Sequence, residues 1–188
     1  MEFAVYVIVG MGLALWVFLN QRKSTNAIKK INNVNQDVNK WLAEKGFIKS
    51  RSIFVGQYET FFVDDINKKW CVIFPDGRET IIYNYNDLLE YEVYEDGNCI
   101  LQGKSGSAVV GGLLFGATGA VIGASGQRNM VNTCRVLQVR ISVNNLVQSE
   151  QVINIIQKPT TKQSIVYTTA IEKAKEIVSV LNYIKNQE

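Results

Sequence analysis

The sequence predicts an α+β protein, in which two N-terminal helices precede an antiparallel β domain that a C-terminal helix covers. Three observations indicate this class. Short runs of alternating apolar and polar residues, separated by turn signals, fill much of residues 51–156. A helical apolar stripe follows at 164–185, and an uncharged apolar run lies near the N-terminus at 3–19. A chain of 188 residues can bury a real core and still carry additional segments.

The composition excludes several kinds of chemistry. The chain has no histidine, so a Ser-His-Asp triad, a Cys-His pair and a His-ligated metal site are impossible. Its charge is uneven: the middle, residues 51–103, is acidic, whereas residues 21–50 and 104–188 are basic. None of these stretches has the dense basic stripe of a nucleic-acid binder, so we expect no nucleic-acid partner. We also expect no metal and no cofactor, because histidine is missing and the glycine spacings match neither a phosphate loop nor a dinucleotide-binding motif.

The first apolar run is predicted to be a transmembrane anchor, assigned to residues 1–21. As a helix it would reach about 26–28 Å, close to the ~30 Å hydrocarbon core of a bilayer. Tyr6 and Trp16 lie toward its two ends, where aromatic rings favour the membrane interface. A cleaved signal peptide fits less well because the basic n-region and the small-residue cleavage site are missing. A buried core helix also fits less well because the run is apolar on all sides.

The residues after this run predict its orientation. Arg22 and Lys23 follow it immediately, so the positive-inside rule places the C-terminal domain in the cytoplasm. Cys71, Cys99 and Cys134 form an odd set without disulfide-framework spacing, as expected for reduced thiols, and we expect them to be buried and inert.

Residues 22–50 are predicted to form a juxtamembrane linker helix that ends at Gly46. Its apolar positions form a narrow helical stripe: Ile28, Ile31, Val34, Val38, Trp41 and Leu42. Such a stripe suits a helix that packs on its own domain or, alternatively, on a second copy of itself.

The β domain is assigned to residues 51–188. Asp76-Gly77 and Asp96-Gly97 lie between apolar runs and are hairpin signals. About seven or eight short strands are predicted, at 53–55, 58–63, 69–74, 79–84, 89–95, 99–102, 136–143 and 151–156. Alternation in the strand at 89–95 suggests that its acidic residues, Glu90, Glu92 and Glu95, face solvent rather than form a catalytic carboxylate pair.

The final helix, at 164–185, carries one apolar stripe: Ala170, Ile171, Ala174, Ile177, Val178, Leu181 and Ile184. Thr169 and Glu172 have capping-box spacing, which suggests that the regular helix begins there. A run of antiparallel strands followed by one helix implies a sheet or barrel whose open side the helix covers.

Five segments accompany this run of strands and its final helix: Val63-Asp64-Asp65, residues 68–72, the acidic strand near Tyr91, the Gly-Gly-Leu-Leu-Phe-Gly sequence at 111–116 and the helix at 177–184. The strands and the final helix resemble the pleckstrin-homology (PH)/GRAM-like superfold, and within it the five segments look like bacterial and prophage-borne membrane proteins. The resemblance covers about residues 51–184 and implies a PH-like sheet or barrel of about seven strands. No ligand motif of the superfold is matched, so it implies no binding residues. Lys68, Lys69 and Arg78 near a hairpin could touch an anionic headgroup, but with Asp64, Asp65 and Asp76 beside them we favour a solvated hairpin.

A glycine-rich apolar insert at 104–128 interrupts this domain. Gly112 and Gly116 are four residues apart, as are Gly119 and Gly123, and this small-xxx-small spacing allows close helix contact in a bilayer. In water each helical glycine costs about 1 kcal/mol relative to alanine, so the insert needs lipid, a partner or a protein groove.

Three geometries are open for the insert. We favour a re-entrant or interfacial hairpin, with Phe115 and the four zipper glycines in contact with the membrane or with another copy. The alternatives are packing within the protein or an oligomer, and a full second span. A full span would put the strands before and after the insert on opposite faces of the membrane, where they could not form one β domain.

These features predict a non-enzymatic, membrane-anchored binding or scaffold protein. Its expected partners are membrane lipids and an unknown protein, and the zipper spacing also allows a homo-oligomer. The prophage-like resemblance implies a host-interaction role such as superinfection exclusion. The alternative is a membrane-perturbing or pore-forming effector that assembles through the insert.

Overall fold

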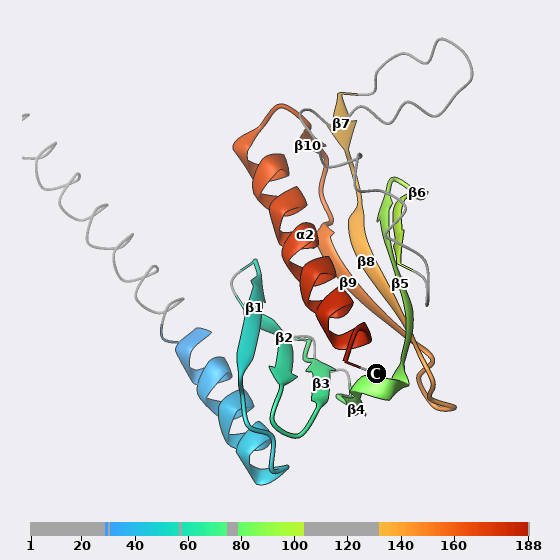
Figure 1. Ribbon diagram of the computed structural model, residues 1–188. Helices are drawn as coiled ribbons and strands as arrows, with labels where there is room; N and C mark the ends of the chain where they lie inside the picture. Colours follow the sequence, from blue (N-terminus) through green and yellow to red (C-terminus); the bar gives the residue numbers. More distant parts are fainter. Residues whose placement is uncertain (1–28, 30, 57, 75–78, 104–131, 188) are drawn as a thin grey trace, which may run out of the picture. The chain divides into compact units, whose positions relative to one another are not determined.

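The computed structural model describes residues 29, 31–56, 58–74, 79–103 and 132–187. The chain divides into two compact units, residues 1–46 and residues 47–188, which are taken separately below (Figure 1).

In the first unit, residues 31–44 form a helix. Its apolar positions are the less exposed ones, and Leu42 is buried, as the predicted stripe requires. Gly46 follows with a φ of +68°, the left-handed conformation that glycine adopts without strain, so the helix ends where the sequence indicates. Among the helices in the described ranges, none combines the length and apolar character needed to cross a bilayer. The predicted anchor lies outside those ranges.

The second unit begins with a four-stranded antiparallel meander. Its strands are β1 (Arg51–Val55), β2 (Tyr58–Asp64), β3 (Lys69–Val72) and β4 (Ile82–Asn84), paired in that order. The aromatic ring of Trp70 lies against Phe61 and Tyr83, with centroid distances of 5.7 and 4.8 Å. Offset aromatic pairs of this kind add to the energy of simple burial.

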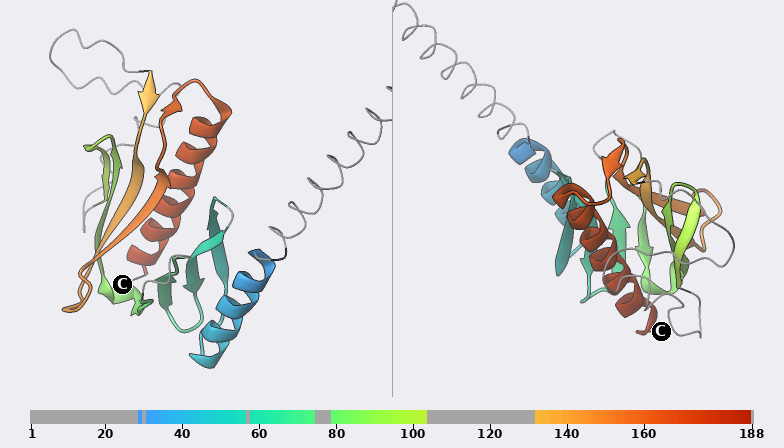
Figure 2. Two further views of the ribbon diagram at one scale, coloured as in Figure 1. Left: turned by 180° about the vertical axis from the view of Figure 1, so that it is seen from behind. Right: turned by 90° about the horizontal axis from the view of Figure 1, so that it is seen from above.

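A second antiparallel sheet has the strand order β6-β5-β8-β9, and it follows the 3-10 turn η1 (Tyr85–Asp87). The strands are β5 (Leu88–Glu95), β6 (Asn98–Gly103), β8 (Leu137–Val143) and β9 (Glu150–Ile156). A short ladder pairs β7 (Thr133–Cys134) with β10 (Thr160–Thr161). Figure 2 shows the two larger sheets from further directions.

Helix α2 (Ile165–Lys185) contacts β1 of the first sheet and β5, β8 and β9 of the second. Its buried side chains are Tyr167, Ala170, Ala174, Ile177, Val178, Val180, Leu181 and Ile184. This set contains every residue of the predicted stripe except Ile171, which is partly buried and packs against the core. Each large apolar side chain buried in this way contributes about 1.5–3 kcal/mol.

The architecture confirms an α+β fold with antiparallel sheets and two helices in the described ranges, but two details of the prediction are wrong. The strands do not close a seven-stranded barrel; they form two four-stranded sheets and a two-stranded ladder. The final helix has the predicted extent, but its regular part begins at Ile165 rather than near Thr169, because the Ser164 side chain caps it by accepting a hydrogen bond from the Tyr167 N–H at 3.2 Å.

Candidate functional site at the base of the insert

The residues predicted to contact the membrane lie outside the described ranges. This applies to Gly112, Phe115, Gly116, Gly119 and Gly123 of the insert. It applies equally to the anchor residues, which are Tyr6, Trp16, Arg22 and Lys23. The structure does describe the residues that flank the insert, and these define the candidate site.

The strand before the insert, β6, and the long strand that follows β7 after the insert, β8, belong to one sheet. Gly103, the last described residue before it, pairs with Tyr91 of β5, and on its other side Tyr91 pairs with Ile141 of β8. Neighbouring strands are about 4.8 Å apart, so Gly103 and Ile141 are about 10 Å from each other. The strand before the insert and the long strand after it therefore flank the same central strand.

The first described residues after the insert are hydrogen-bonded to the segment just before α2. The Asn132 carbonyl accepts a hydrogen bond from the Lys162 N–H at 3.0 Å, and Cys134 pairs with Thr160 in the β7–β10 ladder. The Asp96 carboxylate accepts hydrogen bonds from the N–H groups of Arg135 and Val136, at 2.8 and 2.9 Å. The turn between β5 and β6 thus holds the first residues after the insert.

A polar cluster, which we call the Glu95 cluster, lies at this return point and comprises Glu95, Asp96, Cys134, Lys162 and Tyr167. Glu95 is only 7% exposed. Its carboxylate accepts a hydrogen bond from the Tyr167 hydroxyl at 2.8 Å and forms an ion pair with the Lys162 ammonium. The cluster therefore links β5, the segment after β10 and the first turn of α2.

The contacts within the Glu95 cluster stabilise the fold. Single ligand atoms of Glu95, Asp96 and Cys134 lie within 4.8 Å of one another, a spacing that could suit a metal ion. Both carboxylates, however, already accept hydrogen bonds from protein donors. Burial, together with the charges of Glu95 and Asp96, raises the pKa of the Cys134 thiol to about 11, so it is protonated and a poor ligand or nucleophile at neutral pH. The side chains of this cluster therefore fit a hydrogen-bond network better than they fit a metal centre.

Two predictions about this region are wrong. Glu95 does not face solvent: it shares the buried face of β5 with Tyr91 and Val93, whereas Glu90 and Glu92 are partly exposed as expected. Of the three free cysteines, Cys71 and Cys134 are buried but Cys99 is exposed on β6. Burial raises the pKa of Cys71 to about 12.

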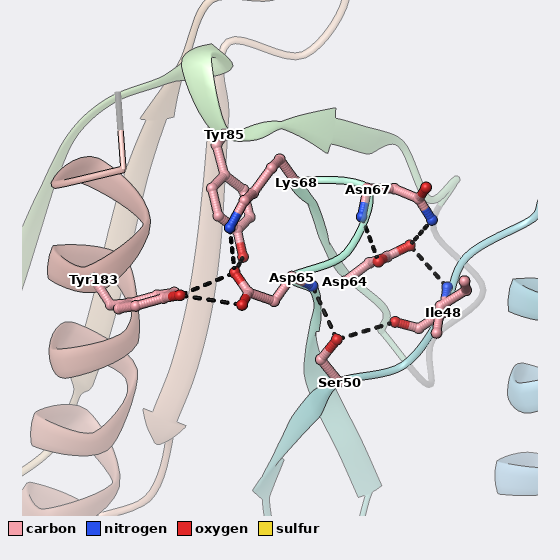
Figure 3. Close-up of polar contacts among 8 residues, drawn as sticks. All are labelled: Ile48, Ser50, Asp64, Asp65, Asn67, Lys68, Tyr85 and Tyr183. Carbon is pink, nitrogen blue, oxygen red and sulfur yellow. Dashed lines mark hydrogen bonds and ion pairs between the residues drawn. The ribbon is translucent and has the colours of Figure 1, made fainter.

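A second polar cluster, the Asp65 cluster, lies at the β2–β3 turn and comprises Asp64, Asp65, Lys68, Tyr85 and Tyr183 (Figure 3). Asp65 forms an ion pair with Lys68 at 2.9 Å and accepts hydrogen bonds from the hydroxyls of Tyr85 and Tyr183, both at 3.0 Å. Lys68 is thus held by Asp65. Arg78 lies outside the described ranges.

Asp64 is the buried anchor of that turn. Its carboxylate accepts hydrogen bonds from the Ile48 N–H at 2.8 Å, the Asn67 N–H at 2.9 Å and the Asn67 side chain at 2.7 Å. Burial by itself raises the pKa of Asp64, but these hydrogen bonds outweigh it and hold the pKa below its ordinary value. Within the described residues, every buried side-chain nitrogen or oxygen has a hydrogen-bond partner.

Lys162 and Tyr167, the partners of Glu95, were not predicted from the sequence. One signal was present, since alternation from Tyr91 and Val93 puts Glu95 on their face and a buried carboxylate requires donors. Nothing local identifies those donors, because Tyr167 is 72 residues away along the chain.

The fold and the position of the insert define a small α+β domain whose second sheet is built from strands on both sides of an apolar, glycine-rich segment. Residues 49–157 match the model of a family described as a glycine zipper containing PH domain. The chain belongs to this family, which confirms the resemblance seen in the sequence. The matched range runs from just before β1 to just after β9. Comparison with curated proteins and with solved structures gave no match.

Proposed function

We propose that this protein is a membrane-anchored, non-enzymatic binding or scaffold module. Its PH-like domain recognises a protein or lipid, while the N-terminal apolar segment and the glycine-rich insert hold that domain against the membrane. Family membership supports a binding or scaffold role. The basic residues after the N-terminal apolar segment, Arg22 and Lys23, favour a cytoplasmic domain.

The observation that carries the proposal is the strand order β6-β5-β8-β9. A single crossing of the bilayer by the insert would separate β6 from β8 by the ~30 Å hydrocarbon core. Both strands pair with β5, which supports a topology in which both flanks of the insert lie on one side of the membrane. This favours an insert that enters the membrane and turns back, with Gly112 and Gly116 opposite Gly119 and Gly123.

The polar clusters in the described ranges support a role without catalysis. In the Glu95 cluster and the Asp65 cluster, the acidic groups are engaged by lysine, tyrosine or backbone N–H donors that stabilise the fold. The resemblance to prophage-borne membrane proteins extends the proposal to a host-interaction role such as superinfection exclusion.

Vesicle flotation combined with dye release tests the proposal. A scaffold predicts that the full chain floats with vesicles without releasing a trapped dye. The variant with Gly116→Leu and Gly119→Leu tests the insert, and Gly126→Leu, outside the two glycine pairs, is the matched control. Dye release by the wild-type chain that this double variant abolishes, while the control retains it, would favour a pore-forming effector instead. A chain that does not float would contradict membrane anchoring.

A further inference from the structure

The end of the domain where the chain returns from the insert has an unusual surface. Helix α2 opens with two consecutive apolar residues, Ile165 and Val166, which are 85% and 64% exposed. The first turn of a helix ordinarily favours acidic residues, because its free N–H groups carry partial positive charge. The first turn of α2 has none.

These two side chains are close to the return point of the insert. Lys162, three residues before Ile165, donates its N–H to the Asn132 carbonyl, and Ser164 caps the helix. In Figure 1, β7 and the start of α2 lie at the same end of the second unit, and the β8–β9 connection lies at the other end. The exposed apolar pair is therefore beside the place where an apolar segment joins the fold.

Two basic side chains are exposed at this end, and its acidic side chains are engaged by protein donors. Arg135 and Lys158 are exposed. Glu95 is buried against Lys162 and Tyr167, and the carboxylate of the exposed Asp96 accepts hydrogen bonds from the backbone N–H groups of Arg135 and Val136. Apolar side chains bordered by basic ones match the interface of an anionic bilayer.

We infer that this end is a membrane-docking surface, in which Ile165 and Val166 enter the interface of an anionic bilayer while Arg135 and Lys158 contact its headgroups. The inference rests on the proposed function, since it needs the insert to hold the domain at the membrane. It adds the orientation of the domain: α2 points its N-terminus at the lipid, and the β8–β9 connection points away.

A site-directed fluorescence experiment tests the inference in the full chain. Cys99→Ser removes the exposed thiol, while Cys71 and Cys134 stay because they are buried. Ile165→Cys receives an environment-sensitive dye in detergent before reconstitution. Leu146→Cys, on the β8–β9 connection and fully exposed, is the matched control. The vesicles are phosphatidylcholine with and without about one quarter phosphatidylserine, with iodide as aqueous quencher on both sides.

The expected result is a blue-shifted dye at position 165 that iodide does not quench in the anionic vesicles, and full quenching at position 146. The Arg135→Glu/Lys158→Glu variant should lose this protection. Equal quenching at both positions in a chain that floats with vesicles would overturn the docking surface and leave the proposed function standing, whereas failure to float would overturn both.

Discussion

Helix α2 is tied to the β domain at both ends by the same kind of contact, and the two ends differ in burial. Near its start, the Tyr167 hydroxyl donates to Glu95, which also pairs with Lys162. Near its end, the Tyr183 hydroxyl donates to Asp65, which also pairs with Lys68. The Glu95 side chain is 8% exposed and that of Asp65 is 40% exposed. Water can replace the contacts of Asp65 but not those of Glu95, so the Glu95 cluster should matter far more for stability.

The largest effect is expected for Glu95→Ala. It leaves the Tyr167 hydroxyl and the Lys162 ammonium without their acceptor, which costs about 2–3 kcal/mol, less than for a fully buried pair because Lys162 is one-third exposed. Urea unfolding of the full chain in detergent, followed by tryptophan fluorescence, measures the change. Glu90→Ala, on the outward face of the same strand, is the control and should cost under about 0.5 kcal/mol. Equal losses for both variants would show that burial of Glu95 is not the cause.

Asp64→Asn should have the next largest effect, about 1–2 kcal/mol at neutral pH, because an amide cannot accept all three hydrogen bonds from Ile48 and Asn67. The folded-state pKa of Asp64 is lowered. Its stabilisation is therefore present above the unfolded-state pKa of about 3.9 and is lost as pH falls through the folded-state value. Unfolding midpoints from pH 7 to pH 2 should show the difference between wild type and variant shrinking below about pH 4. A constant difference would mean that the carboxylate charge plays no part.

Tyr167→Phe should cost about 1 kcal/mol, because it removes one buried hydrogen bond to a carboxylate that keeps its lysine partner. The same urea titration measures it. An unchanged midpoint would mean that the hydroxyl contributes no net stability.

Tyr183→Phe should have the smallest effect, a few tenths of a kcal/mol, because Tyr183 is 44% exposed and water can solvate Asp65 in its place. The loss of stability caused by Tyr183→Phe should also be smaller in high salt, which weakens the exposed Lys68–Asp65 ion pair as well. A loss as large as that of Tyr167→Phe would remove the distinction between the two ends of the helix.

Local patterns predict most of the fold because the strands and the final helix obey simple periodicities. Alternation identifies β8, and the apolar stripe identifies α2, since each places one face in the core. Long-range pairings do not follow from such patterns. Nothing near Glu95 indicates that Lys162 and Tyr167 cover it, and nothing near Tyr183 indicates that Asp65 accepts its hydroxyl.

Local patterns and long-range pairings also contribute different information about the candidate site. The spacing of the four glycines predicts a glycine zipper from the sequence alone: Gly112, Gly116, Gly119 and Gly123. The family match is to a glycine zipper containing PH domain. The sequence also requires both flanks to lie on one side if one β domain forms. That they pair with the same strand, β5, emerges only from the register of Gly103 and Ile141 against Tyr91.

Thiol accessibility across the insert tests the central claim most directly. Single cysteines replace Lys104, Phe115 or Arg128 in the full chain, on a Cys99→Ser background, and intact membranes are treated with an impermeant maleimide from each side in turn. Positions 104 and 128 should react from the same side, and position 115 should be protected. Reaction of positions 104 and 128 from opposite sides would contradict a single-sided insert, because one sheet cannot then contain both β6 and β8.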